Sequence, residues 1–169
     1  MRRPPMPRPT RDDIGFPTGN PDERELLLSW LGYLRGSIVR KLDGVDERGA
    51  RWQPESGRLI CLLGIVNHLT HVEWRWVDGT LLDRAQTSRS EEEFHPRPEL
   101  TVPDAIAAYR ERAAATDAAL RALPGLHTPC ARRPDLNARW VVLHLINETA
   151  RHAGHADATR ELLDGVTGE

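Results

Sequence analysis

Four side chains that could bind a metal recur at helical spacing near the C-terminal end of the chain. They are His144, Glu148, His152 and His155, separated by four, four and three residues. In an α-helix such residues share one face, with neighbouring Cβ atoms about 5–6 Å apart. Glu148 and His152 can therefore reach one ion from a single rigid element, and a facing helix must supply a third ligand.

An earlier helical segment offers two histidines for that third position, His68 and His71. His68 lies one turn from Ile65 and from Val72, on the apolar stripe of its segment, which points it toward the interior of a helical bundle. The predicted metal site is therefore His68, Glu148 and His152.

Two imidazoles and one carboxylate are a common ligand set for a divalent metal that keeps an open coordination position. Water or a substrate thiolate can occupy that position and be activated there. His155 is a candidate fourth ligand. Three side chains are considered as neighbours that contact the metal ligands but do not bind the ion themselves: His144, His155 and Glu73.

Each of these residues also has an ordinary structural interpretation. A helical histidine is often solvated, and Glu148 could be a surface acid that pairs with Arg151 or His152. His95 and His127 lie in predicted loops, where we expect them to be exposed. Cys61 is expected to be a small buried residue rather than a nucleophile. The five tryptophans are expected to anchor the core, with Trp74 and Trp140 as candidates for a pocket mouth.

The first of four predicted helices spans about residues 21–43. Asn20 is its expected N-cap, Pro21 takes the first helical position, and Glu23 is the acid of a capping box. Apolar residues then recur at spacings of three and four up to Gly44, a plausible stop.

Three further segments show the same helical periodicity. They cover about residues 59–82, 102–123 and 137–165; Asn137 is the expected cap of the last, and Gly165 its stop. These helices predict an all-α four-helix bundle with a long crossover loop, residues 83–100, between the second and third helices. Residues 1–19 are proline-rich and predict an extended or disordered tail, so the bundle domain is expected over 20–169.

Composition excludes several classes of protein. With 23 Lys and Arg against 25 Asp and Glu, the net charge of -2 argues against nucleic-acid binding. The longest apolar run, Leu59–Val66, is too short to cross a membrane. Two cysteines and the lack of a secretory signal favour the cytoplasm. A homodimer is plausible, but no face is identified.

Two segments carry a family resemblance: Val66–Glu73 and Arg139–Asp157, the latter with the string Glu-Thr-Ala-Arg-His-Ala-Gly-His-Ala-Asp. From about Glu23 to Gly165 the chain resembles the DinB-like superfamily, and within it the actinobacterial branch related to mycothiol-dependent enzymes. The resemblance implies a four-helix bundle that binds a divalent metal, with zinc the expected ion and nickel the alternative.

In that superfamily one histidine of the second helix and two residues four apart on the last helix bind the metal, and many members have His-x-x-x-His-x-Gly-Gln there. His68 matches the helix-two ligand and His152 the second histidine, whereas Glu148 stands at the first and His155 at the glutamine. The exchange to Glu148 is similar to the ligand set of the mycothiol-dependent maleylpyruvate isomerases.

The activity that the resemblance implies is a metal-dependent thiol S-transferase of detoxification. Its co-substrate would be mycothiol or a related low-molecular-weight thiol, and a small electrophile would bind near the crossover loop. Two alternatives stay open. One is a metal-dependent hydrolase in which Glu73 or His155 acts as the base, and the other is a non-catalytic metal- or ligand-binding bundle.

Overall fold

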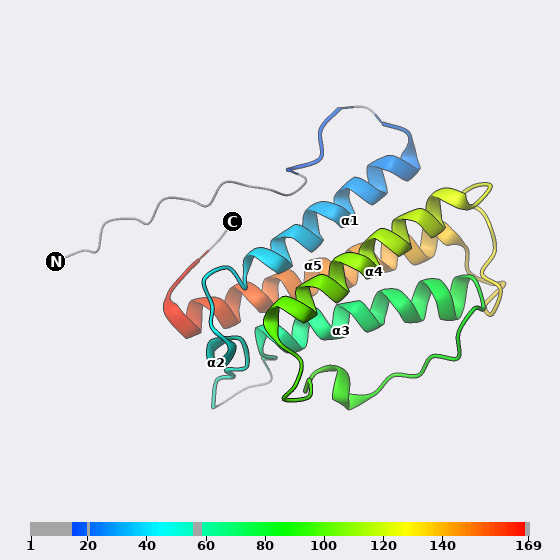
Figure 1. The fold of residues 1–169 in the computed structure, drawn as a ribbon. Helices are drawn as coiled ribbons and strands as arrows, with labels where there is room; N and C mark the ends of the chain where they lie inside the picture. Colours follow the sequence, from blue (N-terminus) through cyan, green and yellow to red (C-terminus); the bar gives the residue numbers. More distant parts are fainter. Residues whose placement is uncertain (1–14, 20, 56–58, 168–169) are drawn as a thin grey trace.

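Four long helices lie side by side in the protein, whose structure is a computed structural model that describes residues 15–19, 21–55 and 59–167 (Figure 1). They are α1 (Glu23–Arg40), α3 (Leu62–Trp74), α4 (Val102–Ala122) and α5 (Ala138–Asp164). The described residues form no strand and contain one isolated bridge, between Pro129 and Asn137. The predicted all-α bundle is thus confirmed.

Three short elements complete the described part of the chain. The one-turn helix α2 (Glu47–Ala50) follows α1, and the π-helix η1 (Arg75–Leu81) continues α3. The 3₁₀ turn η2 (Glu91–Glu93) lies within the crossover segment, which runs along the outside of α3 from the end of η1 to the start of α4 (Figure 1).

The N-terminus of α1 differs from the prediction by about two residues. The cap is Asp22, which has extended backbone and whose carboxylate accepts a hydrogen bond from the backbone N–H of Glu25 at 3.1 Å. Pro21 therefore precedes the cap, and the predicted cap, Asn20, lies outside the described residues. Most of the predicted tail, residues 1–14, lies outside them too, while Phe16 packs edge-on against Trp30 at a ring distance of 4.9 Å.

The second predicted helix is also shorter in its regular part. Cys61 caps α3, because its Sγ accepts a hydrogen bond from the backbone N–H of Gly64, so residues 59–61 are not helical. Beyond Trp74 the turns widen into η1. Apolar spacing does not reveal this widening, since the side chains of both helix types recur every three to five residues.

Both predicted ends of α5 are confirmed. The side chain of Asn137 accepts from the backbone N–H of Trp140, and Gly165 adopts a left-handed φ of 77°, which ends the helix. A helix of 27 residues results. It is long enough to carry His144, Glu148, His152 and His155 on one helix.

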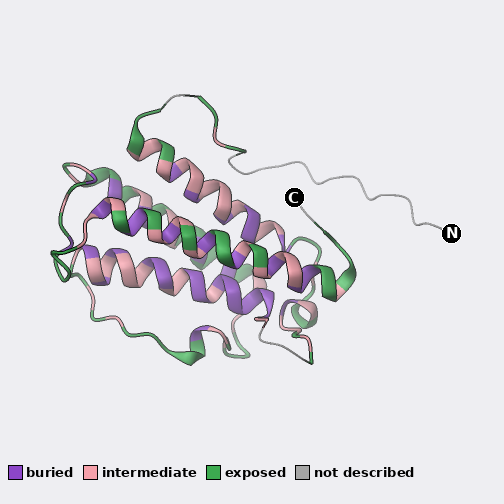
Figure 2. Cartoon of the chain, turned by 180° about the vertical axis from the view of Figure 1, so that it is seen from behind, coloured by how far each residue is buried: buried purple, intermediate pink, exposed green. Residues whose placement is uncertain are grey.

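The apolar stripes of the four helices face one another, and the buried positions follow the inner sides of the helices (Figure 2). Arg35 and Glu73 form an ion pair that is buried within this core. The guanidinium of Arg35 on α1 donates to both carboxylate oxygens of Glu73 on α3, at 2.7 and 2.8 Å, and also to Asp117 on α4 at 2.8 Å. Because a buried charge is costly unless it is paired, these contacts link three helices in one register.

None of the helices in the described part of the chain is long and apolar enough to cross a membrane.

Two glycines, one within α5 and one at its C-terminal end, allow a paired test of the bounds of this helix. A Cβ at Gly154, in the middle of the helix, would meet no atom within 4 Å, whereas Gly165 has positive φ. Gly154→Ala should therefore raise the free energy of unfolding in urea by about 0.5–1 kcal/mol, because alanine loses less backbone entropy in a helix. Gly165→Ala should lower it by about 1 kcal/mol. Equal effects of the two substitutions would contradict the assigned ends of α5.

Candidate metal centre

The three predicted ligands come together between α3 and α5. His68, Glu148 and His152 each offer one ligand atom, and these atoms lie within 4.8 Å of one another. Nε2 of His152 is 3.7 Å from a carboxylate oxygen of Glu148, and the rings of His68 and His152 have centroids 4.8 Å apart. The spacing of four on α5 therefore brings Glu148 and His152 to the same point, as expected.

The ring of His68 is fixed by two residues of the crossover segment. Its Nδ1 lies 3.0 Å from a carboxylate oxygen of Glu93, and the ring of Phe94 stacks on it at 4.2 Å and 26°. With Nδ1 engaged, Nε2 is the atom available to an ion. A carboxylate behind a histidine in this way is the usual support of a metal-ligating imidazole.

Glu93 is buried and is itself held by several donors. Arg75 donates to both of its carboxylate oxygens, at 2.5 and 3.1 Å, and the backbone N–H of Ser90 donates at 3.2 Å. Burial alone would favour the neutral acid, but the hydrogen bonds from Arg75 and Ser90 hold the pKa of Glu93 below its ordinary value. Glu93 is therefore an anion at neutral pH.

Sequence reasoning missed Glu93, because the crossover segment was interpreted only as a charged surface loop. A signal does exist: Ser90-x-x-Glu93 is a capping box, and both of its reciprocal hydrogen bonds are present around η2. The motif marks an ordered turn. It does not indicate that the glutamate reaches His68 on another element.

The two imidazoles of the cluster are neutral at neutral pH. Burial lowers the pKa of His68, and burial is also the main reason that the pKa of His152 is lowered to about 4. Neither ring nitrogen of His152 forms a hydrogen bond to another described residue, and its Nδ1 is buried. A neutral, unsatisfied imidazole beside a second imidazole and a carboxylate fits a divalent cation.

The three other residues considered at the site lie in different surroundings. His155 is adjacent, with its ring edge-on to His152 at 5.4 Å, although its ring is not part of the 4.8 Å cluster found among the described residues. His144 lies one turn from Glu148 and stacks on Trp140 at 5.1 Å.

The structure does not support the role predicted for Glu73, that of a base beside the metal. Both of its carboxylate oxygens accept hydrogen bonds from Arg35 in the core. As a buried partner of a guanidinium, Glu73 cannot serve as the base of the hydrolytic alternative.

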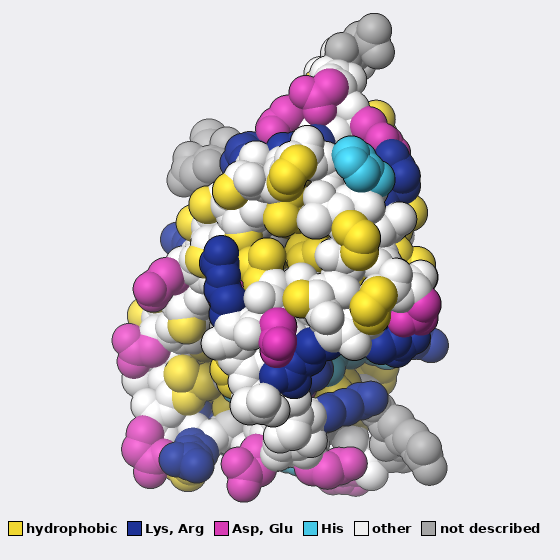
Figure 3. All heavy atoms as spheres, turned by 90° about the vertical axis from the view of Figure 1, so that its right-hand side faces the viewer, with side chains coloured by type: hydrophobic (Ala, Val, Ile, Leu, Met, Phe, Trp, Pro, Cys, Tyr) yellow, Lys and Arg dark blue, Asp and Glu magenta, His cyan; other side chains and the backbone are white. Residues whose placement is uncertain are grey.

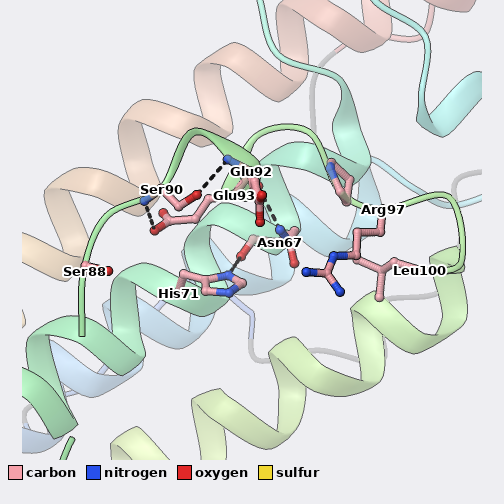
Figure 4. A pocket seen from close by; sticks show the side chains of 9 residues that line it. Asn67, His71, Ser88, Ser90, Glu92, Glu93, Arg97 and Leu100 are labelled. Atoms are coloured by element: carbon pink, nitrogen blue, oxygen red, sulfur yellow. Dashed lines mark hydrogen bonds between the residues drawn. The ribbon is translucent and has the colours of Figure 1, made fainter. Parts of the chain in front are cut away.

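A cavity of about 350 Å³ lies beside the cluster, between the crossover segment and the outer side of α3 (Figure 4). Nδ1 of His71 interacts there with the backbone carbonyl of Asn67 at 2.8 Å. None of the three candidate ligands lines the cavity, whereas Glu93 does. The full lining is Asn67, His71, Ser88, Ser90, Glu92, Glu93, Pro96, Arg97 and Leu100. The cavity is thus a neighbour of the cluster, and Glu93 stands between the two.

The family model described as mycothiol-S-transferase matches residues 26–165, a range that contains all three candidate ligands and Glu93. The chain belongs to the mycothiol S-transferase family. A comparison with curated proteins gave no match. Membership of the mycothiol S-transferase family confirms the resemblance that the α3 and α5 segments carry.

The supporting role of Glu93 can be tested without altering a candidate ligand. Glu93→Ala removes the carboxylate partner of both His68 and Arg75, so the Kd for Zn²⁺ should rise by about 10–100-fold. The control is Glu92→Ala, an exposed acid on the same 3₁₀ turn. Competition with a chromophoric chelator gives both affinities, and circular dichroism checks that the helices persist. An unchanged Kd in Glu93→Ala would show that His68 needs no support from the loop.

Proposed function

We propose that this protein is a divalent-metal-dependent thiol S-transferase that joins mycothiol, or a related low-molecular-weight thiol, to a small electrophile in detoxification. One observation carries the proposal. A chain of the mycothiol S-transferase family brings two neutral imidazoles and a carboxylate within 4.8 Å of one another.

His68, Glu148 and His152 would hold the ion, with zinc expected first and nickel second. Imidazole nitrogen and carboxylate oxygen suit both metals, and three protein ligands leave room for a substrate atom. A divalent cation bound there would lower the pKa of an adjacent thiol, so that the nucleophilic thiolate predominates near neutral pH.

The protein's own residues would prepare the site in two ways. Glu93 orients the His68 ring, so that little reorganisation is needed when a ligand arrives. The positive charges of Arg89 and Arg151 act on His152 from the surroundings of the site. These charges favour an anion, which here is the thiolate.

The family match favours thiol transfer over the two alternatives. A hydrolase would use the same three ligands but would have to rely on His155 as its base, since Glu73 is paired in the core. A non-catalytic module would retain the metal without accelerating conjugation. We place the activity in the cytoplasm, where a reduced thiol pool is maintained.

The test combines metal analysis with a conjugation assay. Purified protein should contain about one divalent ion per chain and should accelerate the conjugation of mycothiol with 1-chloro-2,4-dinitrobenzene. His68→Ala and His152→Ala should lose the ion and return the rate to near the uncatalysed value, while circular dichroism remains helical. His127→Ala, an exposed loop histidine, is the matched control and should change neither.

Two results would contradict the proposal. Loss of the ion without loss of conjugation would separate the metal from the reaction. A metal-loaded protein that conjugates no thiol would favour a binding module.

A further inference from the structure

Three aromatic rings from two elements pack together at one end of the α3–α5 interface. The rings of Trp140 and His144, one turn apart on α5, are stacked with centroids 5.1 Å apart and planes only 8° apart. Trp76 of η1 tilts against both, at 5.0 Å from Trp140 and 4.4 Å from His144. We call these three residues the aromatic shelf.

The aromatic shelf and the candidate metal centre lie along the same interface, the one between α5 and α3 with its continuation η1. Trp76 follows His68 by eight residues, and His144 precedes His152 by eight. The ring pairs His68–His152 and Trp76–His144 are each in contact, which is the pairing expected of antiparallel helices. The two sites are therefore about 12 Å apart along the helices, with Glu148 between them about 6 Å from His144.

The aromatic shelf is partly open and carries no charge that would repel an apolar molecule. Trp140 is 39% exposed, although Val141 and Val142 beside it are buried. Burial lowers the pKa of His144, so its ring is neutral at neutral pH. In the described part of the chain no side chain hydrogen-bonds to the His144 ring, so its position depends on ring packing.

The molecular surface at this end of the bundle is mixed. Figure 3 shows hydrophobic side chains toward the middle of the end that contains the α4–α5 connection, with charged side chains mainly around them. Leu143, also exposed at 49%, lies between Trp140 and Glu148 in sequence but outside the ring cluster. It provides a matched control for an exposed apolar residue of α5.

We propose that the aromatic shelf binds the flat, conjugated part of the electrophile, with Trp140 as the residue that determines specificity. This inference rests on the proposed thiol transfer. Trp140 precedes Glu148 by eight residues, about 12 Å along the helix. A molecule of two linked rings that stacks on Trp140 with its far ring can extend along the α3–α5 interface, so that a reactive carbon at its other end lies near Glu148. Stacking of aromatic rings supplies both affinity and orientation.

The reaction at that carbon balances with the thiol and electrophile alone. With 4-phenylphenacyl bromide, the thiolate sulfur forms the new C–S bond and the C–Br bond breaks. Bromide leaves with the bonding electron pair, and the proton of the thiol passes to solvent.

The first measurement compares an aromatic and an aliphatic electrophile on the metal-loaded protein with mycothiol. Trp140→Ala should raise the KM for 4-phenylphenacyl bromide, a two-ring electrophile with its reactive carbon at one end, about 10-fold with kcat little changed, because it removes the stacking surface. The KM for iodoacetamide, which has no ring, should not change. Trp140→Phe should restore most of the affinity, and Leu143→Ala should behave as the parent protein.

A second measurement does not depend on turnover. Titration of ¹⁵N-labelled protein with the unreactive probe 4-nitrobenzyl alcohol should shift one indole N–H resonance that is missing in Trp140→Ala. A shift without conjugation of any electrophile would support the aromatic shelf and refute the proposed function. Conjugation with the same KM in Trp140→Ala, and no indole shift in the parent protein, would refute the aromatic shelf and leave the function standing.

Discussion

The arrangement of the site depends on one buried carboxylate, that of Glu93. A buried anion is costly unless donors surround it, and this one accepts from Arg75 and from the backbone of Ser90 while its other interaction fixes Nδ1 of His68. The long crossover segment is therefore tied to α3 through the Glu93 side chain. Gly64 permits this approach, since a Cβ there would lie 2.5 Å from the carbonyl oxygen of Phe94.

The contacts between the helices show which interface can bind a metal. Arg35 of α1 is paired with Glu73 of α3 and Asp117 of α4, so the charges of this three-helix cluster satisfy one another. The interface between α3 and α5 is different. Among the described residues, it brings together imidazoles and a carboxylate that are not fully paired.

Features that depend on local spacing could be predicted from the sequence. Glu148 and His152 are four residues apart on one helix, and the cap Asn137 and the stop Gly165 act on the backbone beside them. His68 was identified because its apolar neighbours define the inner face of α3. Contacts between distant segments could not be predicted in this way. No local pattern indicates that Arg35 pairs with Glu73, 38 residues away, or that Glu93 reaches His68. For the same reason Trp74 was considered for the pocket mouth, whereas Trp76 is the tryptophan that contacts Trp140.

An electrophilic substrate could also alkylate the two cysteines of the protein. Both are buried, and burial raises the pKa of each thiol, so that neither is a thiolate at neutral pH. The sulfur of Cys61 is further occupied as the cap of α3. Alkylation would have to add a bulky group inside the bundle. The two cysteine thiols therefore do not compete with the thiol that the protein is proposed to activate.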